Sequence, residues 1–320
     1  MRMITKFLAT VALAAFTAAS FGQPFPSRVI KVVVPQPPGG GFDAVARTMA
    51  EPFSQQLGQP VIVENRPGAG TIVGTEAVAK AEPDGYTLLL GASANLALNP
   101  GLYRKLPYDP KDFKVVGLAA TFSYTLAARQ DLPFNTLREI IDYARANPGK
   151  LTYASGGNGT GQHIAAAVTF HLAGVNITHV PYKGAQAAYQ DLLPGRVDMF
   201  FDNSATAKAH IDNGRVKAIA VSAPQRLAYH PKVPTVREAG VDFEQVTWVG
   251  YFAPGGTPPS ALARLREAFT AAMANPQVPA MLEKRGAFPV RMPVKEAEAL
   301  VASDIEKWTK LLRSAGISAD

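Results

Sequence analysis

Short runs of apolar, often β-branched residues alternate with helix-like segments along most of this chain, and no other feature limits its possible folds as strongly. Each run has the length of one strand, and the runs cover residues 29–34, 61–64, 87–90, 115–119, 124–128, 151–154, 177–180, 197–201, 216–221 and 246–252. Continuous apolar runs of this length are typical of strands that are covered on both faces. From residue 259 onward the pattern is helical only. The alternation predicts an α/β protein with mostly parallel sheets.

Two extended stretches, 119–124 and 246–254, have the character of strands that cross between domains. We therefore expect one domain to consist of residues 24–121 and 249–320, and the other to be the insertion 122–248. Two lobes connected in this way enclose a cleft, which is a common place for a ligand. A single continuous sheet is the alternative that the pattern leaves open.

The N-terminus has the features of a secretory signal peptide. Arg2 and Lys6 precede the apolar run 7–19, and small residues at 20 and 22 suit a cut after Gly22. The run is shorter than the roughly 20 residues that span a bilayer. We expect residues 1–22 to be removed on export to the periplasm. The chain has no cysteine, so neither a lipid anchor at the cut nor a disulfide is expected.

Composition is compatible with a binding protein for anions, and equally with a mild positive charge that serves only solubility. The net charge is +7, from 32 Lys and Arg against 25 Asp and Glu, and it becomes +5 without the two cations of the signal peptide. Mild basicity attracts anionic solutes, whereas no basic cluster with interleaved aromatics suggests nucleic acid. The five histidines show no metal-binding spacing and no GxSxG motif occurs. We expect no metal, no cofactor and no catalytic residue.

A glycine-rich loop follows the first predicted strand and opens a helix. In VPQPPGGGFD (34–43), the glycines Gly39, Gly40 and Gly41 allow a ligand to approach the backbone closely. The first N–H groups of a helix have no internal partner, so they can hold a carboxylate without an arginine. The alternative is an ordinary strand–helix turn. We expect Asp43 to act as the helix N-cap, because its carboxylate would repel an anionic ligand.

The same strand–glycine loop–helix design recurs in the second predicted domain. The segment YASGGNGTGQH (153–163) adds side-chain donors from Ser155, Asn158 and Thr160, and His163 follows. Two such helix starts on opposite sides of a cleft could hold the two ends of a small acid. Weaker candidates follow other strands, at the sheet edge where ligands bind in α/β folds. They are Ser93, Tyr182 and Asp202, of which Asp202 would suit an ammonium group, and each could be an ordinary cap or turn.

Several longer motifs resemble one known family. VPQPPGGGFDAVAR (34–47), ENRPGAGTIVGTEAVAKAEPDGYTLL (64–89), YASGGNGTGQH (153–163), HVPYKGAQAAYQDLLPGRVDMFF (179–201), KVPTVREAG (232–240) and WVGYFAPGGTPPSALARL (248–265) occur in order. Over essentially the whole mature chain, the sequence is similar to the Bug-type receptors, the solute-binding components of tripartite tricarboxylate transporters.

The resemblance implies a type II periplasmic-binding fold, with two lobes, a ligand cleft and two crossing hinge strands. It implies that Gly39 to Asp43 bind one carboxylate, largely by backbone N–H groups and bridging water, and that Gly156 to Thr160 bind the other side. It also implies a permease partner with a large and a small membrane subunit; we expect the receptor to be a monomer. The candidate ligand contacts are Pro38, Gly39, Gly40, Gly41, Phe42, Asp43, Ser93, Ser155, Gly156, Gly157, Asn158, Gly159, Thr160, His163, Tyr182 and Asp202.

The sequence departs from the family pattern at Gln36, Phe42 and Thr71, which leaves the identity of the acid open. Phe42 could stack on an aromatic acid or anchor the helix in the core. Two other functions remain as alternatives. An exported enzyme acting on an organic acid would need a general base, for which His163 is the candidate. A sensor would present its liganded form to a membrane kinase.

Overall fold

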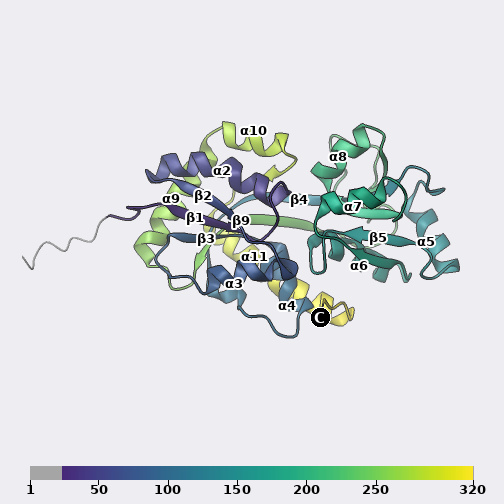
Figure 1. Ribbon diagram of the computed structural model, residues 1–320, viewed down its shortest axis with the longest axis horizontal. Helices are drawn as coiled ribbons and strands as arrows, with labels where there is room; N and C mark the ends of the chain where they lie inside the picture. The colour runs from purple at the N-terminus through teal and green to yellow at the C-terminus, as the bar shows by residue number, and fades with distance from the viewer. Residues whose placement is uncertain (1–23, 320) are drawn as a thin grey trace, which may run out of the picture.

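The computed structural model describes residues 24–319 and shows an α/β protein with two lobes side by side along its long axis (Figure 1). The predicted signal peptide, residues 1–22, lies outside the described residues. In each lobe a sheet is covered by helices on both faces. The α/β class with two lobes and a pair of crossing strands is confirmed. The predicted lobe boundaries at 121/122 and 248/249 stay a prediction.

The first lobe is built on the strand order β2-β1-β3-β9-β4, with β10 added to β4. β1 pairs in parallel with β2 and β3, whereas β9 is antiparallel to both of its neighbours. The strands are β1 (Ile30–Val34), β2 (Val61–Asn65), β3 (Thr87–Ala92), β4 (Phe113–Arg129), β9 (Val246–Pro254) and β10 (Phe288–Pro289). The helices are α2 (Gly41–Leu57), η1 (Ala69–Thr71), α3 (Ile72–Ala79), η2 (Ser93–Leu98), α4 (Asn99–Leu102), η3 (Pro110–Asp112), α9 (Pro259–Ala274), α10 (Gln277–Lys284) and α11 (Val294–Ser314).

The second lobe continues the same hydrogen-bonded path through β4-β7-β5-β6, and β8 also pairs with β4. β5 is parallel to β6 and β7, and β4 is antiparallel to β7 and β8. Its other strands are β5 (Thr152–Ser155), β6 (Thr178–Pro181), β7 (Met199–Asn203) and β8 (Val216–Val221). Its helices are α5 (Leu137–Ala146), α6 (Gly161–Leu172), α7 (Ala185–Leu192) and α8 (Ser204–Asp212).

The long strand β4 corrects two sequence-based expectations. The runs 115–119 and 124–128 were expected as separate strands, but they form one strand because Thr121, Phe122 and Ser123 pair with β9 across the junction. The sheets were expected to be mostly parallel, but they are mixed, since β4 and β9 run antiparallel to their neighbours. Because β4 serves both sheets, the hydrogen bonding is continuous while the ribbon shows two lobes (Figure 1).

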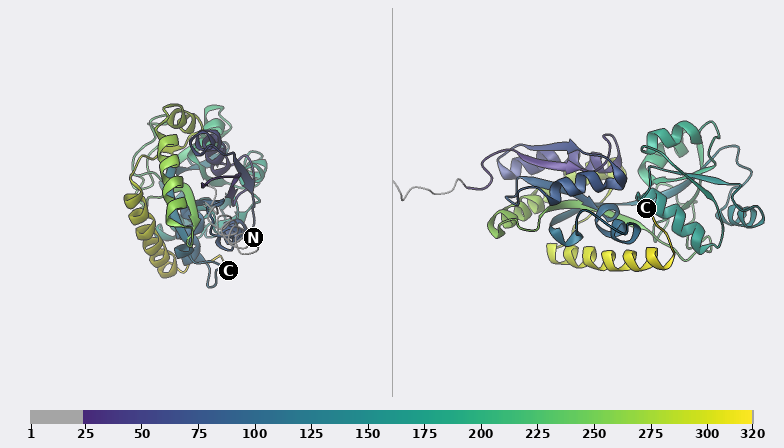
Figure 2. Two further views of the ribbon diagram at one scale, coloured as in Figure 1. Left: turned by 90° about the vertical axis from the view of Figure 1, so that its left-hand side faces the viewer. Right: turned by 60° about the horizontal axis from the view of Figure 1, so that its bottom comes forward.

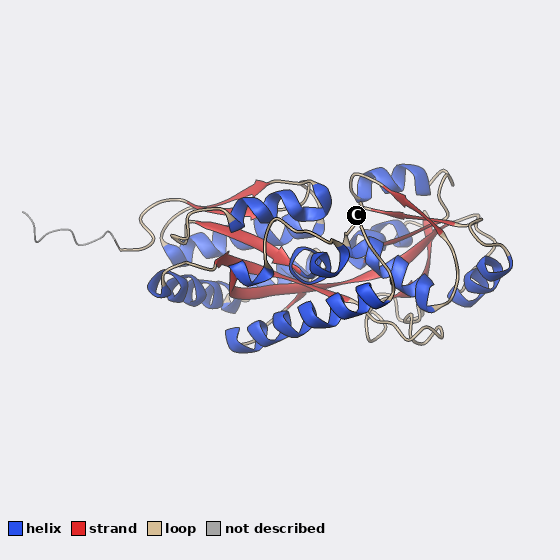
Figure 3. Ribbon diagram, turned by 90° about the horizontal axis from the view of Figure 1, so that it is seen from below, coloured by secondary structure: helices blue, strands red, loops and turns tan. Residues whose placement is uncertain are grey.

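Helices α2 and α11 show how the sequence pattern builds the first lobe. The apolar positions of α2 at helical spacing are all buried: Phe42, Val45, Met49, Phe53 and Leu57. The Phe53 ring lies 5.5 Å from the ring of Tyr251 on β9. On the other face of the sheet, α11 runs along the lobe (Figures 2 and 3), and Trp248 Nε1 of β9 donates to Asp304 Oδ2 at 2.7 Å. Packing thus holds the crossing strand β9 from both faces.

Candidate functional site

The first glycine loop is shaped by Asp43. Gly39 has a left-handed φ of 81°, and its N–H donates to Asp43 Oδ2 at 2.9 Å. Arg47 Nε donates to the same oxygen at 2.9 Å, and Asn65 Nδ2 donates to Oδ1 at 3.0 Å. Burial acts to raise the pKa of Asp43, but the hydrogen bonds from Arg47, Gly39 and Asn65 outweigh it and hold the pKa below its ordinary value.

Asp43 therefore positions the loop from inside the helix. It was expected to be the N-cap, but the N-cap is Gly40, whose extended backbone (φ −82°, ψ 172°) leads into α2. Gly40, Gly41 and Ala44 face a cavity of about 530 Å³. The early N–H groups of α2 have no partner within the helix, so this wall can donate hydrogen bonds and favours negative charge.

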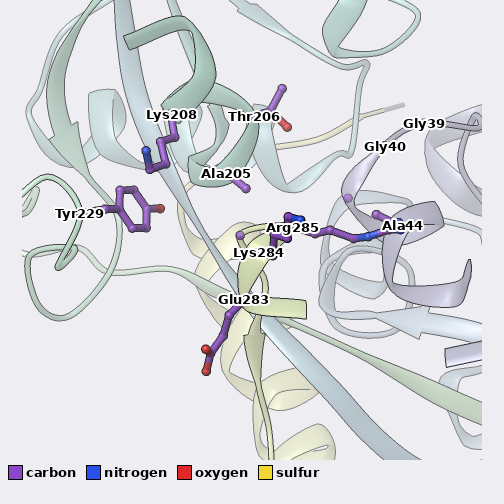
Figure 4. Close-up of a pocket in the computed structure, with 12 residues that line it drawn as sticks. Gly39, Gly40, Ala44, Ala205, Thr206, Lys208, Tyr229, Glu283, Lys284 and Arg285 are labelled. Carbon is purple, nitrogen blue, oxygen red and sulfur yellow. The ribbon is translucent and has the colours of Figure 1, made fainter. Parts of the chain in front are cut away.

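The opposite wall of the cavity comes from the second lobe, at the start of α8. Asn203 caps this helix, because its Oδ1 accepts the N–H of Ala205 at 3.0 Å. Ala205, Thr206 and Lys208 line the cavity, and a methyl group placed on Gly41 would lie 3.2 Å from Asn203 Nδ2. The cavity thus lies between two helix N-termini, one from each lobe (Figure 4).

The end of α10 closes a third side and brings charge. Glu283, Lys284, Arg285 and Gly286 all line the cavity. Figure 4 shows the Glu283 carboxylate directed away from α2 and α8. The combination of helix N-termini and basic side chains makes this cavity suited to an anion.

The second glycine loop does not line this cavity. It packs against the first lobe: a methyl group on Gly70 would lie 2.8 Å from the carbonyl oxygen of Asn158, and one on Gly159 would lie 3.1 Å from the Tyr103 hydroxyl. The segment around Gly70 thus serves as a contact surface for Asn158. The two glycine loops therefore lie in different parts of the interface between the lobes.

Most donors of the second loop are already used within it. The N–H of Gly156 donates to Gln162 Oε1 at 3.0 Å and that of Gly157 to Ser155 Oγ at 3.1 Å. The N–H of Gly159 donates to His163 Nδ1 at 3.3 Å. Thr160 Oγ1 caps α6 by accepting the N–H of His163 at 3.3 Å. A ligand would therefore have to bind other donors of the loop, or replace one of these internal acceptors.

His163 belongs to a stack of rings beneath this loop. Its ring lies 4.2 Å from that of His179, and the planes are nearly parallel. Ser155 Oγ and His179 Nε2 are 2.7 Å apart. Burial lowers the pKa of His163 to about 3, with a further contribution from the charge of His179, and burial lowers the pKa of His179 to about 4. Both imidazoles are neutral near pH 7, so His163 is a weak proton acceptor there.

Asp202 is fully buried behind the second loop. Its Oδ1 accepts the Nε2 of Gln162 at 2.7 Å, and Gln162 in turn holds the N–H of Gly156. Its Oδ2 makes no hydrogen bond of good geometry within residues 24–319, although the Tyr189 hydroxyl is close enough to act to lower the pKa. Burial raises the pKa of Asp202 to about 7, against the opposing effect of the hydrogen bond from Gln162. Asp202 thus supports the loop from behind and does not face the cavity.

The remaining sequence candidates occupy structural positions in this state. Ser93 is 2% exposed, and its Oγ accepts the Trp248 N–H at 3.1 Å. Phe42 is 5% exposed, with its ring 6.1 Å from that of Phe122 on β4, so it anchors α2. The Tyr182 hydroxyl donates to Asp191 Oδ2 at 2.8 Å. Pro38 is exposed beside the loop and is not among the lining residues.

Sequence reasoning did not identify the lining residues of α8 and α10. The start of α8 carries the same strand–helix signal as the glycine loops, but without glycines, in DNSATAK (202–208). Lys284 and Arg285 end a helix, where basic residues are common on any surface. Only the fold brings them to the cavity.

Two general features of residues 24–319 concern function. None of the helices there is long and apolar enough to cross a membrane. Over the same residues, no three side chains of the metal-binding kinds are grouped so that they could hold an ion.

Comparison with known proteins gives consistent matches along nearly the whole chain. The profile of the family described as "Tripartite tricarboxylate transporter family receptor" matches residues 45–317. The "UPF0065 protein in tcbD-tcbE intergenic region" of Pseudomonas sp. (strain P51) is 40% identical over 96% of this chain and 93% of its own length. The structure of the periplasmic binding protein BugD is 35% identical, with a TM-score of 0.84 over 92% of this chain and 99% of that one. MatC from Rhodopseudomonas palustris with bound malate is 34% identical, with a TM-score of 0.84 over 90% and 100%.

Proposed function

The chain belongs to the tripartite tricarboxylate transporter receptor family, and on that premise we propose that it captures a small organic carboxylate in the cavity between α2, α8 and α10. As a member, it is a periplasmic solute-binding protein of a tripartite transporter. Malate, which MatC binds, is a small organic acid of the kind expected here.

The observation that carries the proposal is the composition of the cavity wall. Gly40 and Gly41 present the start of α2 from the first lobe, and Ala205 and Thr206 present the start of α8 from the second. Both helix ends favour negative charge. Neither wall alone surrounds a ligand, so binding depends on the two lobes being close together.

The second glycine loop has a supporting role in this proposal. Asn158 contacts the first lobe at Gly70, so the loop stabilises the closed arrangement of the lobes. Its residues Gly156 to Thr160 take part in binding when the ligand or a bridging water replaces one of the internal bonds. We propose that the lobe boundaries lie at 121/122 and 248/249, where β4 and β9 cross.

Several further features complete the proposal. The receptor delivers its ligand to a permease with a large and a small membrane subunit. It acts as a monomer and carries out no catalysis. Residues 1–22 direct export and are removed. The low pKa of His163, which burial lowers to about 3, argues against its use as a general base near pH 7.

A thermal-shift screen of residues 23–320 tests the proposal. The panel contains dicarboxylates, tricarboxylates, aromatic acids and acidic amino acids, each with its amide as a control. Ligand at 100 times its Kd stabilises the folded state by about 2.7 kcal/mol. We expect at least one acid to raise the melting temperature while its amide does not. Equal shifts with acid and amide, or no shift with any acid, would contradict carboxylate capture.

A further inference from the structure

The two lobes touch where α10 meets α8, next to the cavity. Gly286 follows α10 with a left-handed φ of 71°, and a methyl group there would overlap the Cβ of Ala205. Glycine is needed at this position both for its backbone conformation and for the close approach. Because α10 belongs to the first lobe and α8 to the second, this contact spans the cleft. It holds the preceding residue, Arg285, beside the cavity.

The basic side chains at this contact differ in how far their charge is compensated. Lys208 forms an ion pair with Asp212 and lies 5.6 Å over the ring of Tyr229. Lys284 and Arg285 form no ion pair within residues 24–319. Both side chains are exposed, so their charges are free to attract an anion that enters the cavity they line.

These cations and the first glycine loop line different sides of the same cavity. Gly39, Gly40 and Gly41 form one wall, and Arg285 reaches the cavity from the end of α10 (Figure 4). A volume of about 530 Å³ exceeds the space that one carboxylate group fills. A guanidinium group binds a carboxylate through two parallel hydrogen bonds, so Arg285 is suited to orient a second acidic group.

We infer that Arg285, assisted by Lys284, is a specificity-determining residue that binds the second carboxylate of a ligand whose first carboxylate lies at the start of α2. The inference rests on the proposed function and adds to it a preference for ligands with two acidic groups. A ligand with one carboxylate leaves the charge of Arg285 unpaired in the closed state, and so binds more weakly.

The test measures Kd for wild type and two variants by isothermal titration at fixed ionic strength. The probes are malonate, succinate, glutarate, malate and adipate, their monoamides, and the monocarboxylates propionate, hexanoate, benzoate and lactate. The variant Arg285→Gln removes the charge at the cavity. The variant Arg291→Gln removes the same charge from an exposed position beyond β10 that is not among the lining residues.

We expect at least one dicarboxylate to bind wild type about ten-fold or more tightly than its monoamide. In Arg285→Gln this ratio falls to near one, while Arg291→Gln keeps the wild-type ratio. Equal binding of dicarboxylates and monoamides, binding of monocarboxylates alone, or a ratio unchanged in Arg285→Gln would overturn the inference and leave carboxylate capture standing. Failure of every acid to bind wild type would refute the proposed function and the inference together.

Discussion

Replacing Asp202 with asparagine should stabilise the protein, and the gain should depend on pH. Asp202 is 0% exposed, and burial raises its pKa from 3.8 to about 7. The folded state therefore holds a proton that the unfolded state releases between these values, so stability from this group falls as pH rises from about 4 to 7. A shift of about 3 pKa units corresponds to roughly 4 kcal/mol at pH 8, as an upper value.

Asparagine keeps an oxygen for the Nε2 of Gln162 and places an NH₂ group where Oδ2 makes no hydrogen bond of good geometry. It removes the cost of ionisation, so Asp202→Asn should approach a gain of roughly 4 kcal/mol at pH 8, or up to roughly 8 °C in melting temperature. Near pH 5 the gain should fall to roughly 1.6 kcal/mol, because this pH is only about one unit above the unfolded-state pKa of 3.8. Calorimetry of variant and wild type at both pH values measures it.

The control for this experiment is Asp198→Asn on the same part of the sheet. Asp198 accepts a bond from Arg129 Nε at 3.0 Å and from the N–H of Thr152 at 2.8 Å. Losing its charge removes an ion pair, so this variant should be less stable than wild type at both pH values. If Asp202→Asn also lost stability at pH 8, or gained equally at pH 5 and 8, the assignment of a buried, uncompensated carboxylate would be wrong.

Three further predictions concern stability. Burial lowers the pKa values of His163 and His179 to about 3 and 4, so the free energy of unfolding should fall as pH drops from about 6.5 to 4. In denaturant titrations, His179→Gln should reduce this total loss by up to about 3 kcal/mol. The same loss in variant and wild type would contradict the prediction. Asp304→Leu should cost about 1–3 kcal/mol, because it leaves the indole N–H of Trp248 unpaired; equal denaturation midpoints would show that this bond contributes nothing. Gly117→Ala should destabilise by about 1–3 kcal/mol, since the methyl group would overlap the buried Phe269 ring, and wild-type stability by calorimetry would refute this packing.

The sequence predicted the elements better than their connections. Apolar spacing located α2, and β-branched runs located most strands, because burial of one face imposes a regular pattern. The pattern failed at 121–123, where Thr121 and Ser123 interrupt the apolar run but pair with β9. The direction of each strand relative to its neighbours could not be predicted either, since a continuous apolar run is compatible with parallel and antiparallel pairing.

One wall of the proposed cavity was predictable from the sequence. The loop Gly39–Gly41 can be recognised from the sequence, because three glycines before a helix allow a ligand to approach the free backbone N–H groups closely. The second loop carries the same signal, yet its donors are bonded to Gln162, Ser155 and His163 in the described state. Such internal bonds depend on side-chain geometry, so they cannot be predicted from the residue pattern. The lining residues of α10 lie more than two hundred residues from the first loop, and tertiary packing of α10 against α2 and of Gly286 against Ala205 brings them to the cavity.

Titration of Gly40→Val with the acid that most stabilises wild type tests the central claim most directly. The backbone of Gly40 is extended, and a Cβ there meets no atom nearer than 3.8 Å, so valine is compatible with the fold while its methyl groups occupy the cavity wall. Gly40→Ala, a smaller addition, serves as the graded control. We predict an unchanged melting temperature without ligand, affinity weakened about 100-fold or more in the valine variant, and an intermediate loss for alanine. Wild-type affinity in a folded Gly40→Val protein would show that the carboxylate binds elsewhere.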